Sequence, residues 1–147
     1  MSAPEPEALA AALFSEIGQL DLDETDRART IYLELRRLRQ QQPASFGTSV
    51  ALIMATLRVG RREEALNEIG RAYGLKTTAD IISWGALADL SIFVGQLDRG
   101  AELYERLRSV PGALAIPQVS QNAASSAVVR GDIEYLRSIA DEDKKVN

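Results

Sequence analysis

The stretch "SWGALADLSIFVGQLDRGAELYERL", residues 83–107, shows most clearly how this chain is organised. An apolar segment precedes Gly95 and a more charged segment follows it, and in both segments apolar residues recur at spacings of three and four. That spacing is typical of amphipathic α-helices, and glycine is a frequent residue where a helix ends. The stretch therefore predicts two helices joined by a turn at Gly95.

The same arrangement occurs twice more, in "LRVGRREEA" around Gly60 and in "VVRGDIEYL" around Gly131. The three glycines are separated by 35 and 36 residues, which is the length of one helix-turn-helix unit in an α-solenoid. Other positions keep the same phase, since the residues eight before and nine after each glycine are apolar or small: Leu52, Leu87 and Ala123 before, and Ile69, Tyr104 and Ala140 after. The pattern predicts a repeat.

Within this repeat, Trp84 lies eleven residues before Gly95, a small residue lies five residues after the turn (Ala65, Gly100), and an aromatic residue follows at Tyr104. This pattern resembles the tetratricopeptide repeat (TPR) over residues 46–141. The sequence departs from it at Ser49 and Ser120, where the family favours tryptophan, and at Leu136, which replaces the small residue of the last unit. The resemblance implies an all-α fold, a right-handed α-α superhelix of about eight helices in four units.

The expected organisation is one domain over residues 1–147, with units at about 5–43, 46–76, 79–112 and 117–141 and a flexible tail at 142–147. A chain of this length buries enough apolar surface to fold without a metal or a disulfide. Small residues such as Ala65 and Gly100 are expected to let paired helices approach closely.

The composition excludes several classes of protein. The chain has no cysteine and no histidine, which removes the usual zinc ligands and the Ser-His, Cys-His and imidazole chemistries. A net charge of −4 and an isoelectric point near 4.9 argue against nucleic-acid binding,. No apolar run approaches the roughly 20 residues of a membrane span, and the first residues lack the basic segment of a signal peptide. We expect a cytoplasmic protein without a cofactor.

The acidic run "DLDETD", residues 21–26, raises the question of a calcium loop. Such a loop starting at Asp21 needs glycine at its sixth position and glutamate at its twelfth, but Asp26 and Tyr32 occupy these places,. The favoured interpretation is a helix start, with Asp23 or Thr25 as the cap and Glu24 near the positive end of the helix dipole. No metal site is expected.

Two further features have a functional and a structural interpretation. Arg36, Arg37 and Arg39 offer positive charge to an acidic ligand, but the favoured expectation is a solvated helix face and ion pairs to residues 1–26, which hold seven acids and no Lys or Arg,. Trp84 offers a ligand platform, but the repeat phase places it on a packing face between helices. Packing is the expected role of Trp84.

No catalytic residue is expected, because the chain has no glycine loop of phosphate-binding spacing and no serine with an adjacent base. In TPR proteins the first helix of each unit lines a concave groove, and here these helices carry apolar and amide side chains rather than the cations of a carboxylate clamp. Such a groove suits the apolar face of an amphipathic helix. The expected partner-binding residues are Val50, Met54, Arg58, Ile82, Asp89, Phe93, Gln118, Gln121 and Ser125.

The leading hypothesis is a non-enzymatic adaptor or chaperone that binds a helical or extended segment of another protein. Small acidic TPR-like proteins also resemble the export chaperones of bacterial type III secretion, which suggests one setting for such a function. Three alternatives stay open: some groove side chains close the core instead, the repeats form a structural module that self-associates as a homo-oligomer, or carboxylates catalyse a reaction.

Overall fold

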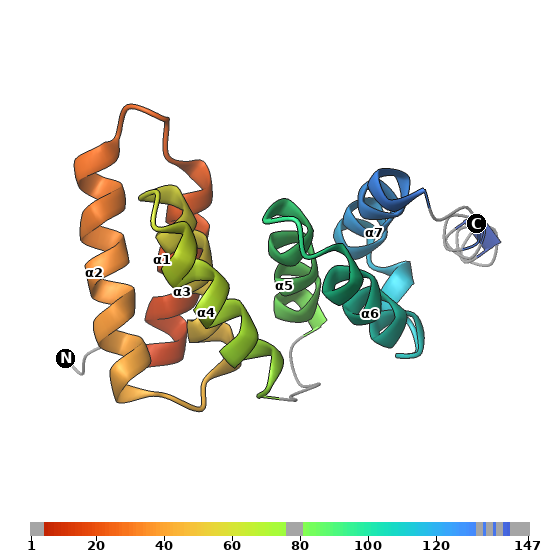
Figure 1. Ribbon diagram of the computed structural model, residues 1–147. Coiled ribbons are helices and arrows are strands. Elements are labelled where there is room, and N and C mark those ends of the chain that lie inside the picture. Colours follow the sequence, from red (N-terminus) through yellow and green to blue (C-terminus); the bar gives the residue numbers. More distant parts are fainter. Residues whose placement is uncertain (1–4, 76–80, 132–133, 135–136, 138–139, 142–147) are drawn as a thin grey trace. The chain divides into compact units, whose positions relative to one another are not determined.

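The computed structural model describes residues 5–75, 81–131, 134, 137 and 140–141, and within this part the protein is helical without strands. The described residues form seven α-helices, against about eight expected for the chain (Figure 1). The region expected to form the last helix, including Leu136, and the tail at 142–147 lie largely outside the described residues. The helices are α1 (Pro6–Gln19), α2 (Thr25–Gln41), α3 (Phe46–Arg58), α4 (Arg62–Tyr73), α5 (Ile81–Phe93), α6 (Leu97–Arg108) and α7 (Pro117–Arg130), with a short 3-10 helix, η1, at Ala113–Ala115.

Local sequence accounts for several helix boundaries. Pro6 and Pro117 start α1 and α7 at the first helical position, where the missing proline N–H costs nothing,. Ser45 caps α3, because its hydroxyl oxygen accepts a hydrogen bond from the Thr48 backbone N–H at 3.2 Å,. The expected cap of α2 is wrong: Glu24 occupies the cap position, and its carboxylate accepts the backbone N–H of Asp21 at 2.8 Å instead of capping the helix.

The three glycines of the repeat all adopt the left-handed backbone conformation that the turn requires. Their φ angles are +82° at Gly60, +91° at Gly95 and +70° at Gly131. Residues with a Cβ atom reach this region only with strain, so glycine is the favoured residue at these positions. The prediction that Gly60 and Gly95 join paired helices is confirmed by the elements on either side of them.

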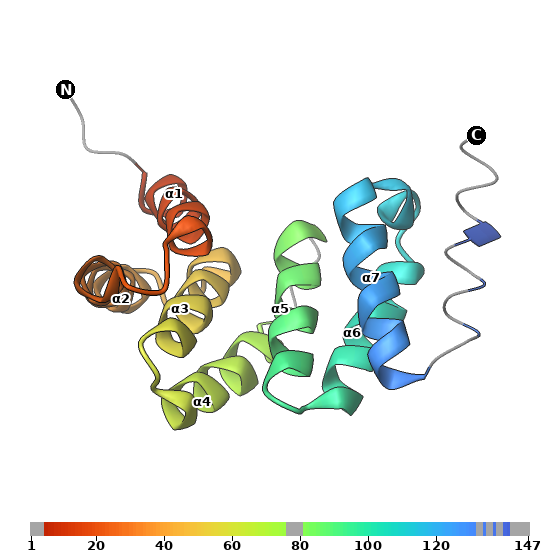
Figure 2. The ribbon, with the colours of Figure 1, turned by 90° about the horizontal axis from the view of Figure 1, so that it is seen from above.

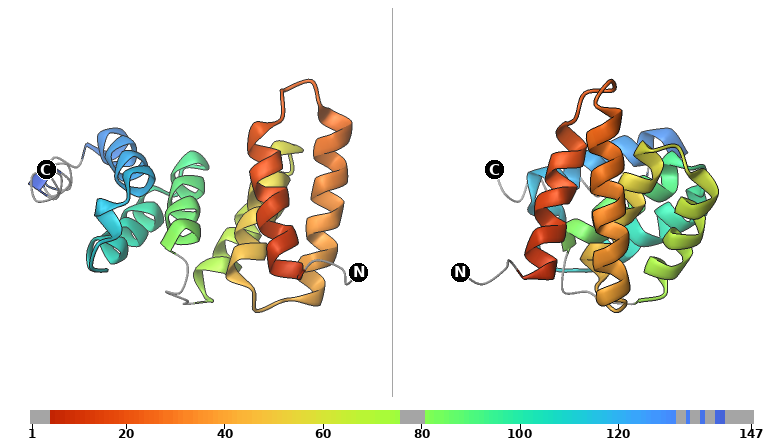
Figure 3. Two further views of the ribbon diagram at one scale, coloured as in Figure 1. Left: turned by 180° about the vertical axis from the view of Figure 1, so that it is seen from behind. Right: turned by 90° about the vertical axis from the view of Figure 1, so that its left-hand side faces the viewer.

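The chain divides into two compact units, Met1–Thr77 and Thr78–Asn147, which we call unit 1 and unit 2 and describe separately. In unit 1, α1 and α2 run side by side and are joined by a loop at one end (Figure 3). Helix α3 packs against α1, α2 and α4. It is therefore the central helix of unit 1, which explains why nine of its thirteen residues are buried.

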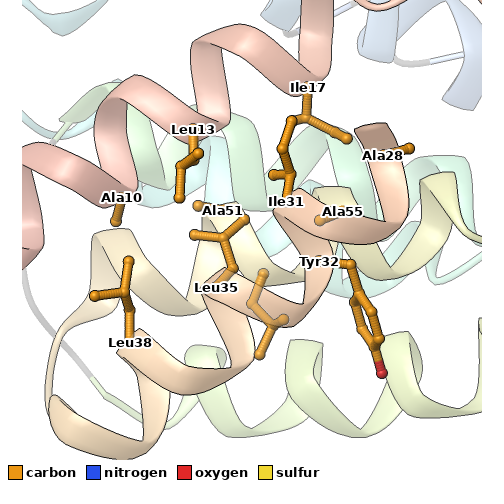
Figure 4. Packing of buried hydrophobic residues seen from close by; sticks show 11 residues of the cluster. Ala10, Leu13, Ile17, Ala28, Ile31, Tyr32, Leu35, Leu38, Ala51 and Ala55 are labelled. Atoms are coloured by element: carbon orange, nitrogen blue, oxygen red, sulfur yellow. The ribbon is translucent and has the colours of Figure 1, made fainter. Parts of the chain in front are cut away.

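The core of unit 1 is formed mainly by aliphatic side chains that α1, α2 and α3 turn toward one another, with Tyr32 as its aromatic member (Figure 4). The α2 residues Ile31, Leu35 and Leu38 recur at spacings of three and four, as the sequence pattern predicts for one apolar face,. The buried members of this cluster are Ala10, Leu13, Ile17, Ala28, Ile31, Tyr32, Leu35, Leu38, Ala51, Leu52 and Ala55.

Ion pairs across unit 1 differ from the expected ones. Arg39 donates two hydrogen bonds to the carboxylate of Glu68 in α4, at 3.0 and 2.9 Å. Nε of Arg36 lies 3.9 Å from Oε1 of Glu64, which also belongs to α4. Arg37 pairs with Glu34 within α2. Among the described residues, none of the three pairs with an acid of the N-terminal segment, because Arg36 and Arg39 face carboxylates of α4 and Arg37 pairs within its own helix. The acid of that segment that does pair is Glu16 of α1, whose partner is Arg27.

In unit 2, α5 and α6 form a closely packed hairpin and α7 packs against both (Figure 2). Gly100 of α6 makes the close approach possible, since a Cβ atom there would lie 2.3 Å from Cγ1 of Ile92 and 3.0 Å from the carbonyl oxygen of Ala88. Trp84 is 4 % exposed, and the guanidinium carbon of Arg106 lies 5.8 Å from the centroid of its ring system. The expected packing role of Trp84 agrees with this burial.

Candidate interaction surfaces

The expected groove residues of unit 1 are largely engaged within the unit itself. Val50 is only 2 % exposed, so its side chain belongs to the core and we correct its assignment as a contact residue. Met54 is half-buried against the core, and its methyl group lies 3.7 Å from the position that a Cβ atom of Gly18 would occupy. The Arg58 guanidinium donates to the backbone carbonyl of Asp21 and so ties α3 to the loop between α1 and α2.

The expected groove residues of unit 2 differ in their accessibility. Phe93 is 77 % exposed, and Gln121 of α7 is exposed as well. Asp89 is half-buried, and its carboxylate accepts a hydrogen bond from the hydroxyl of Tyr104, which holds it against α6. The side chains of Ile82, Gln118 and Ser125 lie outside the described part of the structure. Among the expected residues whose side chains are described, Phe93 is thus the apolar one most available to a partner.

Two further exposed apolar side chains lie at the same end of unit 2 as Phe93. Leu97, at the start of α6, is 42 % exposed, and Val128, in the last turn of α7, is 66 % exposed. Helices α5 and α7 pack against each other and end on the same side of the unit (Figure 2), and Phe93 is the last residue of α5 while Val128 lies three residues before Gly131. We call Phe93, Leu97 and Val128 the unit 2 apolar end.

Sequence reasoning did not identify Leu97 or Val128. Leu97 opens a strongly polar helix and Val128 stands in "SSAVVRG", so each looks like part of the buried stripe of its helix. One feature of the sequence could have indicated their exposure: both residues lie within three positions of a turn glycine. At a helix end the neighbouring helix often no longer covers the apolar face. Isolated exposed apolar residues are common on protein surfaces, so their gathering at one end carries more information than their exposure.

A polar cluster in unit 1 was also not expected from the sequence. The hydroxyl of the buried Tyr32 donates to Glu64, and the guanidinium carbons of Arg36 and Arg61 lie 5.6 and 5.5 Å from the centroid of its ring. Burial first, and then the hydrogen bond to Glu64, raises the pKa of Tyr32 above its ordinary value of 10.0. The cluster joins α2 to α4, so we assign it a structural role.

The described residues offer no evidence of a metal centre or a membrane segment. In this part of the chain no three acidic side chains come together in an arrangement that could hold a metal ion. No described helix combines the length and apolar character needed to cross a bilayer.

Comparisons with known proteins add no family assignment. No family model, no curated protein and no solved structure matches this sequence.

Proposed function

We propose that this protein is a non-enzymatic protein-binding module in which the unit 2 apolar end receives the apolar face of an amphipathic helix from a partner. The observation that carries the proposal is the 77 % exposure of Phe93, together with Leu97 and Val128 at the same end of the unit. Aromatic side chains that are exposed in the free protein and buried in a complex supply much of the binding free energy at protein interfaces.

The surroundings of this end support a helical ligand. Helix-in-groove recognition uses a few apolar anchors spaced by one or two helical turns. The turn glycines next to these anchors leave open space there, since no atom of the described part of the chain lies within 4 Å of a Cβ position at Gly95 or Gly131. The resemblance to TPR proteins suggests the same class of function, with a chaperone or adaptor, including one for type III secretion, as its biological setting.

The test is selection from a phage-displayed library of amphipathic helical peptides, followed by affinity measurement. The double variant Phe93→Glu, Val128→Glu is expected to bind the selected peptides at least about tenfold more weakly. A tenfold rise in Kd corresponds to about 1.4 kcal/mol of binding free energy, which the loss of one anchor residue can cause. Leu33→Glu is the matched control, because Leu33 is an exposed leucine of unit 1. Peptides that bind the folded double variant as well as the wild type would refute the proposal.

A further inference from the structure

The loop between α1 and α2 presents one leucine surrounded by acidic residues. Leu22 is 86 % exposed, and Asp21, Asp23 and Glu24 flank it. The backbone N–H of Glu24 donates to the carbonyl oxygen of Asp21 at 3.1 Å, and Arg58 donates to the same carbonyl. The loop is therefore held in one conformation, with Leu22 turned toward solvent. We call residues 21–24 the acidic loop.

The outer side of α2 presents the opposite combination. Arg29, Leu33 and Arg37 follow one another at intervals of four residues, so they form one stripe along the helix,. Leu33 is 52 % exposed, and no carboxylate among the described residues lies within ion-pair distance of Arg29. We call these three residues the basic stripe. The core residues Ala28, Ile31 and Leu35 occupy the other side of the helix, so the basic stripe has no helix packed on it in unit 1.

Leu22 and Leu33 are the two large exposed apolar side chains of the described part of unit 1. Leu22 lies among acidic residues, whereas Leu33 lies between Arg29 and Arg37, of which Arg37 is already paired with Glu34, so Arg29 supplies the unbalanced positive charge of the stripe. The acidic loop does not cover the basic stripe of its own chain, since both leucines are exposed and Arg58 fixes the loop to α3. We propose that the basic stripe of one copy of this protein binds the acidic loop of a second copy, with Leu22 packed beside Leu33.

This contact is heterologous, because each copy uses two different surfaces. One copy's loop occupies the next copy's stripe and leaves its own stripe free, so association continues head to tail unless the rotation between copies closes a ring. The electrostatic part of the attraction acts between exposed groups and is therefore screened by salt: the Debye length falls from about 30 Å at 0.01 M to about 3 Å at 1 M ionic strength. Self-association is expected to be weak and to depend on salt.

The experiment uses two variants of the full chain that each disable one surface. Leu22→Arg places a cation in the acidic loop, and Leu33→Glu places an anion in the basic stripe. Both positions are exposed, and circular dichroism melts serve as the control for folding. Sedimentation velocity at about 0.01 M and about 1 M salt then compares the wild type, each variant alone and an equimolar mixture of the two.

The wild type is expected to associate with rising concentration at low salt and to lose this association at high salt. Each variant alone is expected to be monomeric, while the mixture forms a 1:1 heterodimer and nothing larger, because one variant keeps the stripe and the other keeps the loop. A wild type that stays monomeric at about 1 mM, where even a weak contact of −4 kcal/mol would be populated, overturns the proposal. Association that both variants retain, or a mixture that stays monomeric, overturns it as well.

These outcomes are independent of the proposed function. Peptide binding at the unit 2 apolar end uses Phe93 and Val128, so both unit 1 variants are expected to keep it.

Discussion

The glycine at position 100 provides a sharp test of how tightly α5 and α6 are packed. Replacing a glycine inside a helix by alanine ordinarily stabilises a protein by about 0.5–1 kcal/mol. At Gly100, however, the new Cβ atom would lie 2.3 Å from Cγ1 and 2.8 Å from Cδ1 of Ile92, and 3.0 Å from the Ala88 carbonyl oxygen. The two contacts under 3.0 Å are both with Ile92, so its side chain causes most of the overlap, and the approach to the Ala88 carbonyl oxygen at 3.0 Å adds a smaller part.

Overpacking of this kind lowers the free energy of unfolding by about 1–3 kcal/mol, and the short distances place Gly100→Ala toward the upper end of this range. Since alanine also favours the helix by about 0.5–1 kcal/mol, the expected net loss of stability is about 2 kcal/mol. Gly85→Ala is the matched control, because Gly85 lies on the partner helix α5 and its Cβ position is 3.9 Å from the nearest atom, Cδ1 of Leu107. There the same substitution is expected to stabilise by about 0.5–1 kcal/mol.

The assay is urea unfolding followed by the fluorescence of Trp84, the one tryptophan, which is buried in unit 2 and so reports on the unit that holds both glycines. A double-mutant cycle with Ile92→Ala then isolates the overlap. In that background Gly100→Ala is expected to lose most of its cost. The reasoning is refuted if Gly100→Ala is as stable as Gly85→Ala, or if removing the Ile92 side chain leaves its cost unchanged.

Three further predictions concern the polar contacts and the turns. Glu68→Gln is expected to destabilise unit 1 by about 2–3 kcal/mol, because Glu68 is 7 % exposed and balances the charges of Arg39 and Arg71,. Native-state hydrogen exchange measures this loss. The control is Glu34→Gln, which removes an exposed ion pair and should have no measurable effect,. Tyr32→Phe should remove a phenolate transition that lies above pH 10 from an alkaline absorbance titration. The pKa of Tyr32 is raised in the folded state, so its contribution to stability is complete below about pH 10 and is lost as the pH rises through the raised value,. Gly95→Ala should destabilise unit 2 by about 1 kcal/mol by Trp84 fluorescence, because φ at this position is +91°,.

Each of these has a distinct contrary result. Equal exchange protection in the Glu68 and Glu34 variants would mean that the Arg39 pair contributes no more than a surface contact. A titration curve for Tyr32→Phe that differs from the wild type near pH 10 would show an unperturbed tyrosine. A stabilised Gly95→Ala protein would show that the turn adopts another conformation.

Features that depend on local conformation could be predicted from the sequence. The spacing of apolar residues identified the helical fold, since that spacing reflects the period of the α-helix itself. Gly60, Gly95 and Gly131 were expected at turns, and all three have the positive φ that favours glycine. The expected close approach at Gly100 was also correct. The described residues form seven α-helices where about eight were expected for the chain, and the cap of α2 was assigned to Asp23 or Thr25 when Glu24 occupies it.

The candidate surface was predicted less well because exposure depends on what packs over a helix. Val50 follows the repeat phase of a groove residue, yet α3 is covered by three helices and Val50 is buried. Phe93 lies two residues before Gly95, the repeat position that Arg58 holds before Gly60, and it remains 77 % exposed. A spacing of four residues places Val50, Arg58 and Phe93 on the predicted groove face of their helices, but it does not show which part of that face a neighbouring helix covers.

The sequence by itself therefore determined the helical class, the turn glycines and the small residue between α5 and α6, since each depends on a backbone dihedral angle or a volume encoded at one position. Only the tertiary structure decided that Arg39 pairs with Glu68, 29 residues away, and that Phe93, Leu97 and Val128 stay exposed at helix ends of unit 2. Such contacts depend on where whole helices come to lie. The contact partners of a side chain are therefore set by distances between helices in the folded protein and not by spacing along the chain.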